Sequence, residues 1–185
     1  MTDIVEVLRQ EHCNIEKLLR VLERELSVFD RGDRPDYEVI RAVIDYFKDY
    51  PDSCHHPKED MIFEKLKARD HLRAAMVGDL DARHLEGANR LRRVGEAVEC
   101  VLGDQDLLRQ TIHDIISDFV TQERQHMAME ERVLFPAALD VLRPNDWTEI
   151  GLKLVDQRPV RPAGLRREIQ DALPRHLGDG SGSGG

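Results

Sequence analysis

Residues 126–136 read HMAMEERVLFP, a stretch in which His126 and Glu130 stand four positions apart. Residues four apart on an α-helix lie on the same face, one turn apart, so these two side chains project together. Apolar residues recur at helical spacing on both sides of the stretch. This pattern predicts a helix over about residues 105–142, with a bend near Pro136.

Three earlier segments show the same helical spacing of apolar residues. They cover residues 4–30, about 36–66 and about 72–102. Asp36 is suited to cap the second segment, which Pro51 and Pro57 should kink or interrupt. The third segment is predicted to stop at Gly103. Four helices joined by short connections predict an all-α fold, an antiparallel four-helix bundle.

The chain is predicted to divide into three parts. Residues 1–142 form the bundle, residues 143–177 a short helical appendage, and residues 178–185 a flexible tail of glycine and serine. The appendage holds the single tryptophan, Trp147, which is expected to pack against the same chain.

The composition favours one soluble domain of ordinary size. Apolar residues make up 41% of the 185 residues, enough for a single core, but no apolar run is long enough to span a membrane. Acidic residues outnumber basic ones by 36 to 27, which argues against nucleic acid or anionic lipid as a partner. Three cysteines at unrelated spacings, and a start without a signal-peptide pattern, predict free thiols and a cytoplasmic location.

Two halves of the chain repeat one arrangement of histidine and glutamate. The repeated positions are His12 and His84, then His55 and His126, then Glu59 and Glu130. The first pair is 72 residues apart and the other two pairs are 71 residues apart. Each half therefore holds a lone histidine followed by an H-x-x-x-E motif. Random helical sequence seldom supplies two such matched spacings, so the six residues are predicted to form one site.

The chemistry of these six residues indicates a centre of two metal ions midway along the bundle. Imidazole suits iron, zinc, copper and nickel, and carboxylates add hard oxygen atoms that can bridge two cations. The predicted ligands are His12 and His55 on one ion, His84 and His126 on the other, with Glu59 and Glu130 between them. Each ion keeps positions open for a bridging oxide or hydroxide and for an exogenous ligand. The absence of cysteine argues against a closed structural zinc site, but manganese or zinc could also occupy these ligands.

A metal-free interpretation also exists for each motif taken singly. An exposed His and Glu four apart on a helix form a common surface pair, worth only tenths of a kcal/mol. Six such groups buried without partners on the apolar side of a bundle would cost several kcal/mol, and metal binding would compensate all six together. The set as a whole therefore favours a metal centre.

These motifs resemble the hemerythrin-like family, also described as HHE cation-binding domains. The resemblance covers roughly residues 4–142 and rests on QEH at 10–12, HHPKEDMIF at 55–63 and HMAMEERVLFP at 126–136. It implies a di-iron centre, two iron ions with a bridging oxide or hydroxide, that can meet dioxygen, peroxide or nitric oxide.

Two positions depart from the oxygen-carrying hemerythrins. Those proteins have H-x-x-x-H on the third helix, whereas here the residue four after His84 is Ala88. Their last motif is H-x-x-x-x-D, whereas here it is H-x-x-x-E. One histidine ligand is therefore missing. Glu16, four after His12, and His56 are candidates to replace it.

Three functions follow as hypotheses. The first is a protein that binds or senses dioxygen, nitric oxide or iron at a carboxylate-bridged di-iron centre. The second is a di-iron enzyme that decomposes hydrogen peroxide, favoured by the missing histidine. The third is a metal-free interaction bundle.

Overall fold

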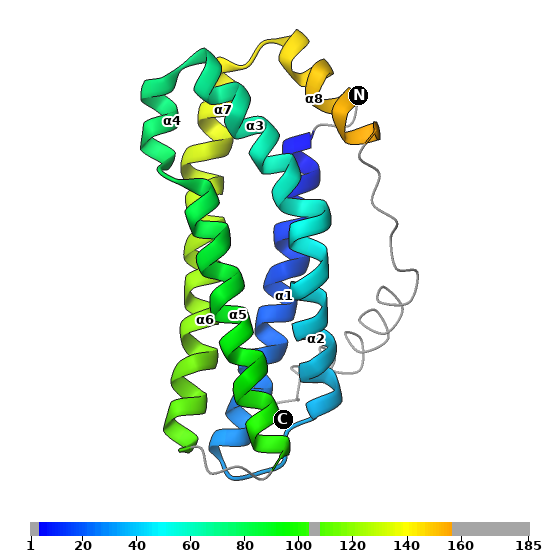
Figure 1. Cartoon of the computed structure of the whole chain (residues 1–185), viewed down its shortest axis with the longest axis vertical. Coiled ribbons are helices and arrows are strands. Elements are labelled where there is room, and N and C mark those ends of the chain that lie inside the picture. Colours follow the sequence, from blue (N-terminus) through cyan, green and yellow to red (C-terminus); the bar gives the residue numbers. More distant parts are fainter. Residues whose placement is uncertain (1–3, 104–107, 157–185) are drawn as a thin grey trace, which may run out of the picture.

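The described part of the chain is built from helices. A computed structural model describes residues 4–103 and 108–156 (Figure 1). Within these ranges no strand is formed, which confirms the all-α class. Among the same residues, no helix has the length and apolar content needed to cross a membrane. The predicted tail, most of the appendage and the predicted start of the last helix at residue 105 lie outside the described residues.

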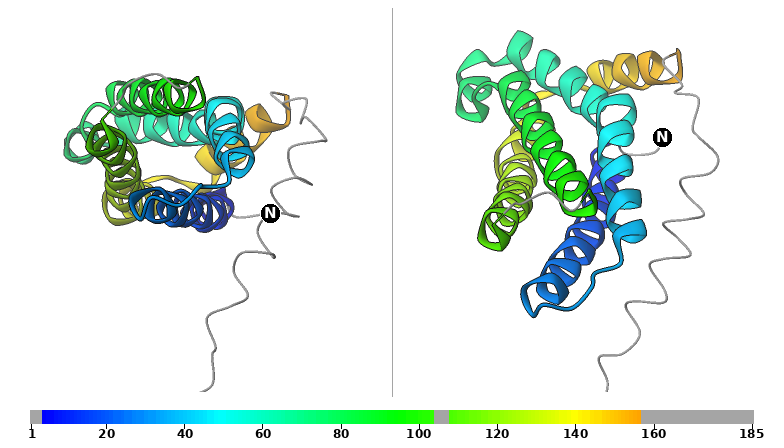
Figure 2. Two further views of the ribbon diagram at one scale, coloured as in Figure 1. Left: turned by 90° about the horizontal axis from the view of Figure 1, so that it is seen from below. Right: turned by 60° about the horizontal axis from the view of Figure 1, so that its bottom comes forward.

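The helices form four adjacent columns around a common interior (Figures 1 and 2). The elements in chain order are α1 (Ile4–Asp30), α2 (Tyr37–Tyr50), the π-helical turn η1 (Pro51–His55), α3 (His56–Arg69), α4 (His71–Val77), α5 (Leu80–Leu102), α6 (Arg109–Met129), the π-helical turn η2 (Glu130–Leu134), α7 (Phe135–Val141) and α8 (Pro144–Asp156). The chain descends along α1 and α5 and returns along α2 with α3 and along α6 with α7 (Figure 1). A simple bundle of four helices is not confirmed as such, because α4 and α8 are additional helices and π-helical turns divide two of the columns.

The predicted helix over residues 72–102 is wrong in one respect, because α4 and α5 are separate. The break lies at Gly78, whose φ of 87° is left-handed and suits a residue without a Cβ atom. Asp79 then caps α5 by accepting a hydrogen bond from the backbone N–H of Ala82 at 3.0 Å. The cap predicted at Asp36 is confirmed, since its carboxylate accepts from the N–H of Val39 at 3.1 Å.

Both π-helical turns stand just before a proline. In η1 the N–H of His56 bonds to the carbonyl of Pro51, five residues back. In η2 the N–H of Phe135 bonds in the same way to the carbonyl of Glu130. Pro57 and Pro136 follow directly and donate no backbone hydrogen bond, which interrupts the α-helical ladder at the predicted places. Such turns are frequent at functional sites, and these two contain His55 and Glu130.

Two apolar clusters fill the interior, one toward each end of the columns. The first includes Leu19, Phe47 and Phe119, and the second includes Leu8 and Phe135. Along α1, α2 with α3, α5, and α6 with η2, the predicted ligands lie between residues of one cluster and residues of the other. The fold therefore encloses a polar layer between two apolar ones.

Helix α8 is held on α3 by a buried carboxylate. Asp146, only 1% exposed, accepts from the Arg69 guanidinium at 3.1 and 2.9 Å and from the N–H of Arg143 at 2.9 Å. Trp147 packs against the second apolar cluster, so it contacts its own chain as expected.

Replacing Asp146 by alanine is expected to lower the free energy of unfolding by roughly 1 kcal/mol or more, since it removes the acceptor of the hydrogen bonds from Arg69 and from the N–H of Arg143. Arg69 and the N–H of Arg143 hold the pKa of this carboxyl below its usual range. Its contribution is therefore present at neutral pH and is lost as the pH falls through the lowered pKa. Urea unfolding should separate the two proteins at about pH 7 and less at about pH 3. Glu149→Ala, at an exposed neighbour, is the control. Identical curves for Asp146→Ala and wild type would contradict this role.

Candidate metal centre

The structure brings all six predicted ligands into the polar layer. They come from every column: His12 from α1, His55 from η1, Glu59 from α3, His84 from α5, His126 from α6 and Glu130 from η2. His12, His55, Glu59 and Glu130 are buried, whereas the side chains of His84 and His126 are 11% and 14% exposed. Part of the site is therefore enclosed and part lies closer to solvent.

Glu59 faces histidines from both halves of the chain. Its Oε1 lies 3.0 Å from Nε2 of His55 and 3.6 Å from Nε2 of His12. Its Oε2 lies 3.5 Å from Nε2 of His84. The two carboxylate oxygens thus point to different histidine groups.

Glu130 is placed in the same manner. Its Oε2 lies 3.3 Å from Nε2 of His12, and its Oε1 lies 3.0 Å from Nε2 of His126. A carboxylate that bridges two cations needs this placement, with one oxygen toward each ion.

Although these nitrogen–oxygen distances are short, most of the buried ligand atoms form no hydrogen bond. In the described part of the chain, all but one of the buried side-chain nitrogen and oxygen atoms without a hydrogen bond belong to the predicted ligands. They are His12 Nε2, Glu59 Oε1 and Oε2, His84 Nε2, His126 Nδ1 and Nε2, and Glu130 Oε1 and Oε2. Burying so many polar atoms without partners is costly, and bound cations would compensate the cost. The donor set of imidazole nitrogens and carboxylate oxygens fits a pair of metal ions.

The buried carboxylates strongly favour positive charge on the groups around them. Burial opposes charge on His12, yet Glu130 and Glu59 raise its pKa to about 10. Burial likewise opposes charge on His55, whose pKa Glu59 and Glu11 nevertheless raise to about 9. Burial disfavours the ionised form of Glu59, but the surrounding histidines hold its pKa well below its usual range. The interior therefore attracts cations, whether protons or metal ions.

Glu11 orients one histidine from outside the ligand set. It accepts hydrogen bonds from Nδ1 of His55 at 2.9 Å and from the Tyr50 hydroxyl at 2.8 Å, and the Lys58 ammonium at 2.8 Å balances its charge. A hydrogen bond at Nδ1 leaves Nε2 free to face a metal. Glu11 carries no motif of its own in the sequence, and its position directly before His12 was the only available signal.

The lone histidine of each half faces an acidic residue from the other half. Glu131 accepts from Nδ1 of His12 at 3.0 Å and from Arg9 at 3.1 Å. Nδ1 of His84 lies 3.6 Å from Oδ1 of Asp60, which is longer than a hydrogen bond. Asp60 and Glu131 each follow the glutamate of an H-x-x-x-E motif directly, so the repeat itself could have identified this pair.

Glu11→Ala is expected to weaken metal binding by roughly 10- to 100-fold, the range found when an outer partner of a ligand is removed. The reason is that the ring of His55 loses the acceptor that fixes its tautomer and direction. Titration of the metal-free protein with Co²⁺ measures the change. Glu6→Ala, at an exposed glutamate on the same helix, is the matched control. An unchanged affinity in Glu11→Ala would contradict the orienting role.

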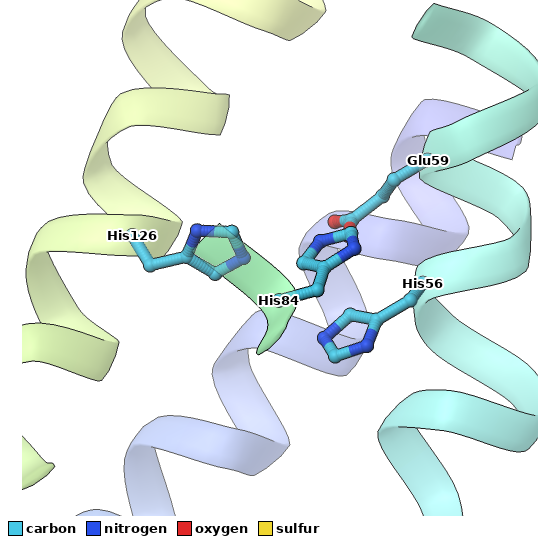
Figure 3. Close-up of side chains that lie close together, drawn as sticks. All are labelled: His56, Glu59, His84 and His126. Atoms are coloured by element: carbon cyan, nitrogen blue, oxygen red, sulfur yellow. The ribbon is translucent and has the colours of Figure 1, made fainter. Parts of the chain in front are cut away.

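The two candidates for the missing ligand have different positions. Glu16 accepts hydrogen bonds from Arg20 at 2.8 Å and Arg124 at 2.9 Å and belongs to neither group of clustered donors. His56 belongs to the group that also contains Glu59, His84 and His126, in which one donor atom of each residue lies within 4.8 Å of the others. Figure 3 shows these four side chains together, with the ring of His56 against that of His84.

A groove of about 730 Å³ reaches the less buried side of the site. His56, His84 and His126 lie at the groove, and apolar side chains such as Ile44 and Phe119 contribute to its walls. Ala88, which stands where oxygen-carrying hemerythrins have a further histidine, also lines it. We refer to the group His56, Glu59, His84 and His126 as the groove-side group, and to His12, His55, Glu59 and Glu130 as the inner group.

Comparison with known proteins gives one match. A family model described as "Hemerythrin HHE cation binding domain" matches residues 3–138. No curated protein and no solved structure matches the chain.

Proposed function

The chain belongs to the hemerythrin HHE cation-binding family, and from this premise we propose that it is a non-haem di-iron protein with an antiparallel four-helix core that binds or senses dioxygen, nitric oxide or iron. One observation carries the proposal. Of the nine buried side-chain nitrogen and oxygen atoms without hydrogen bonds in the described residues, eight belong to five of the six residues that the repeat selects. Bound cations, which are expected for a member of a cation-binding family, would explain why these atoms lie together without hydrogen bonds.

The proposed ligands divide between the two groups. One ion would be held by His12 and His55, the other by His84 and His126, and both by Glu59 and Glu130. Neutral histidines and two carboxylates supply only two negative charges to two cations, so the occupied site retains positive charge. This charge favours anionic or readily reduced ligands. Bound iron would supply open coordination positions and exchangeable electrons for such a ligand.

The other residues serve to orient the ligands and exclude water. Glu11 and Glu131 fix the rings of His55 and His12, so that each presents Nε2 to the interior. The two apolar clusters seal the polar layer along the columns. The groove gives a small molecule access to the site beside His84 and His126.

Metal quantification combined with optical spectra tests the proposal. Protein purified under iron-replete conditions is expected to retain about two irons per chain, two being the number of histidine groups that share the carboxylates. The reduced protein is then exposed to dioxygen, nitric oxide and peroxide in turn, and visible absorption bands should change with at least one of them. Failure to retain iron would reject the proposal.

A second candidate, decomposition of hydrogen peroxide, is favoured by Ala88. Four residues after His84, this methyl group stands at the groove where a histidine could have blocked a coordination position. Iron-loaded protein would evolve dioxygen from peroxide, and His84→Ala and Glu130→Ala would abolish the reaction. An iron-loaded wild type without turnover would exclude the enzyme and leave the binding function.

A further inference from the structure

We infer that His56 is an additional metal ligand, a third imidazole that makes the groove-side ion different from the inner one. The inference rests on the proposed function and deepens it. It assigns the replacement for the histidine that is missing at position 88.

The first observation is the position of the His56 ring. It stacks on the ring of His84 with centroids 3.7 Å apart and an angle of 12° between the planes. The ring of His126 stands nearly perpendicular to it, at 6.3 Å and 86°. Figure 3 shows the three imidazoles and Glu59 converging from α3, α5 and α6. One donor atom of each of these four residues lies within 4.8 Å of the others, close enough for all four to share one metal ion.

The second observation is an asymmetry between the two halves of the chain. The repeat aligns His56 with Met127, which is buried in the first apolar cluster. One half thus has a packing side chain where the other has an imidazole beside two further histidines. The aligned position is filled by a methionine, so packing at this position does not require an imidazole. Packing alone therefore does not account for His56.

The third observation is the difference in enclosure. The four residues of the inner group are all buried, so protein atoms surround an ion there. Three residues of the groove-side group are only partly buried, and Ala88 supplies no donor from α5. His56 fills part of this deficit from α3. The groove-side ion then has three imidazoles, whereas the inner ion has two.

Co²⁺ titration of the full-length, metal-free chain tests this assignment. Visible absorption and calorimetry report the number of ions, their affinities and the change in cobalt coordination. Wild type is expected to bind two ions. His56→Ala and His56→Phe should bind the inner ion normally and the second ion at least about tenfold more weakly, with an altered cobalt spectrum.

The phenylalanine variant separates ligation from stacking. It keeps a flat ring against His84 but has no nitrogen donor, so a ring that only positions His84 would be replaced without loss. Wild-type binding by His56→Phe would therefore overturn the inference, as would loss of both ions together. His113→Phe, at a partly exposed histidine paired with Asp30, is the control. Wild type that binds fewer than two ions would instead reject the proposed function itself.

Discussion

Glu59→Ala is expected to yield a folded protein that retains almost no metal. Glu59 is the residue shared by the inner and groove-side groups, and its two oxygens face His55 and His84 respectively. Its removal therefore affects both ions. Loss of an outer partner of a ligand weakens metal binding by roughly 10- to 100-fold. Loss of this carboxylate, itself a ligand, should weaken the binding of each ion by more than about 100-fold.

The fold should survive this change because His12 and His55, whose pKa values Glu59 raises, can become neutral once the carboxylate is removed, so no unpaired charge stays buried. Glu59→Gln tests the same point without creating a cavity, since it keeps the volume and removes the charge. Metal analysis after dialysis measures retention, and circular dichroism measures helix content. Glu64→Ala, at an exposed glutamate of α3, is the matched control. Two tightly held ions in Glu59→Ala would refute the bridging position of Glu59.

Removal of the metal is expected to have the largest effect on stability. A ligand that binds only the native state stabilises it by about 4 kcal/mol when present at about 1,000 times its Kd, and two ions would contribute separately. The effect is specific to the polar layer that contains the predicted ligands. The ligand atoms without hydrogen bonds destabilise the metal-free fold, and bound ions would remove this cost.

Thermal unfolding of the iron-loaded and chelated proteins in one buffer measures this difference. Glu59→Ala should melt at the same temperature with and without iron, which separates binding at the site from weak binding elsewhere. A wild-type melting temperature that does not respond to iron would favour the metal-free interaction bundle.

Much of the fold followed from features that act locally. The first helix was predicted with its observed bounds because apolar spacing is continuous up to Asp30 and a turn with Gly32 follows. Asp36 was identifiable as a cap from residue type alone. The break at Gly78 was missed, since an isolated glycine inside a helical pattern is often tolerated and its left-handed backbone leaves no trace in periodicity.

The site was predictable to the extent that the repeat defined it. Spacing selected the six residues, and the structure places all six together. Glu11 was missed because its partners, Tyr50 and His55, come from another column. His56 was only a candidate, because its direction depends on the π-helical turn that precedes it and on the packing of α5 against α3. Neither property is encoded in the spacing of ligands.

The geometry of the site depends on the number of residues in the two π-helical turns but not on the number of residues in the loops. Each α-helical residue rotates the chain by about 100°. Deleting one residue from η1 would therefore change the phase of α3 and turn Glu59 away from the interior. An insertion between α1 and α2, at residues 31–36, would leave that phase intact. Relatives with this centre should thus vary in loop length while keeping the residue count between Pro51 and Glu59.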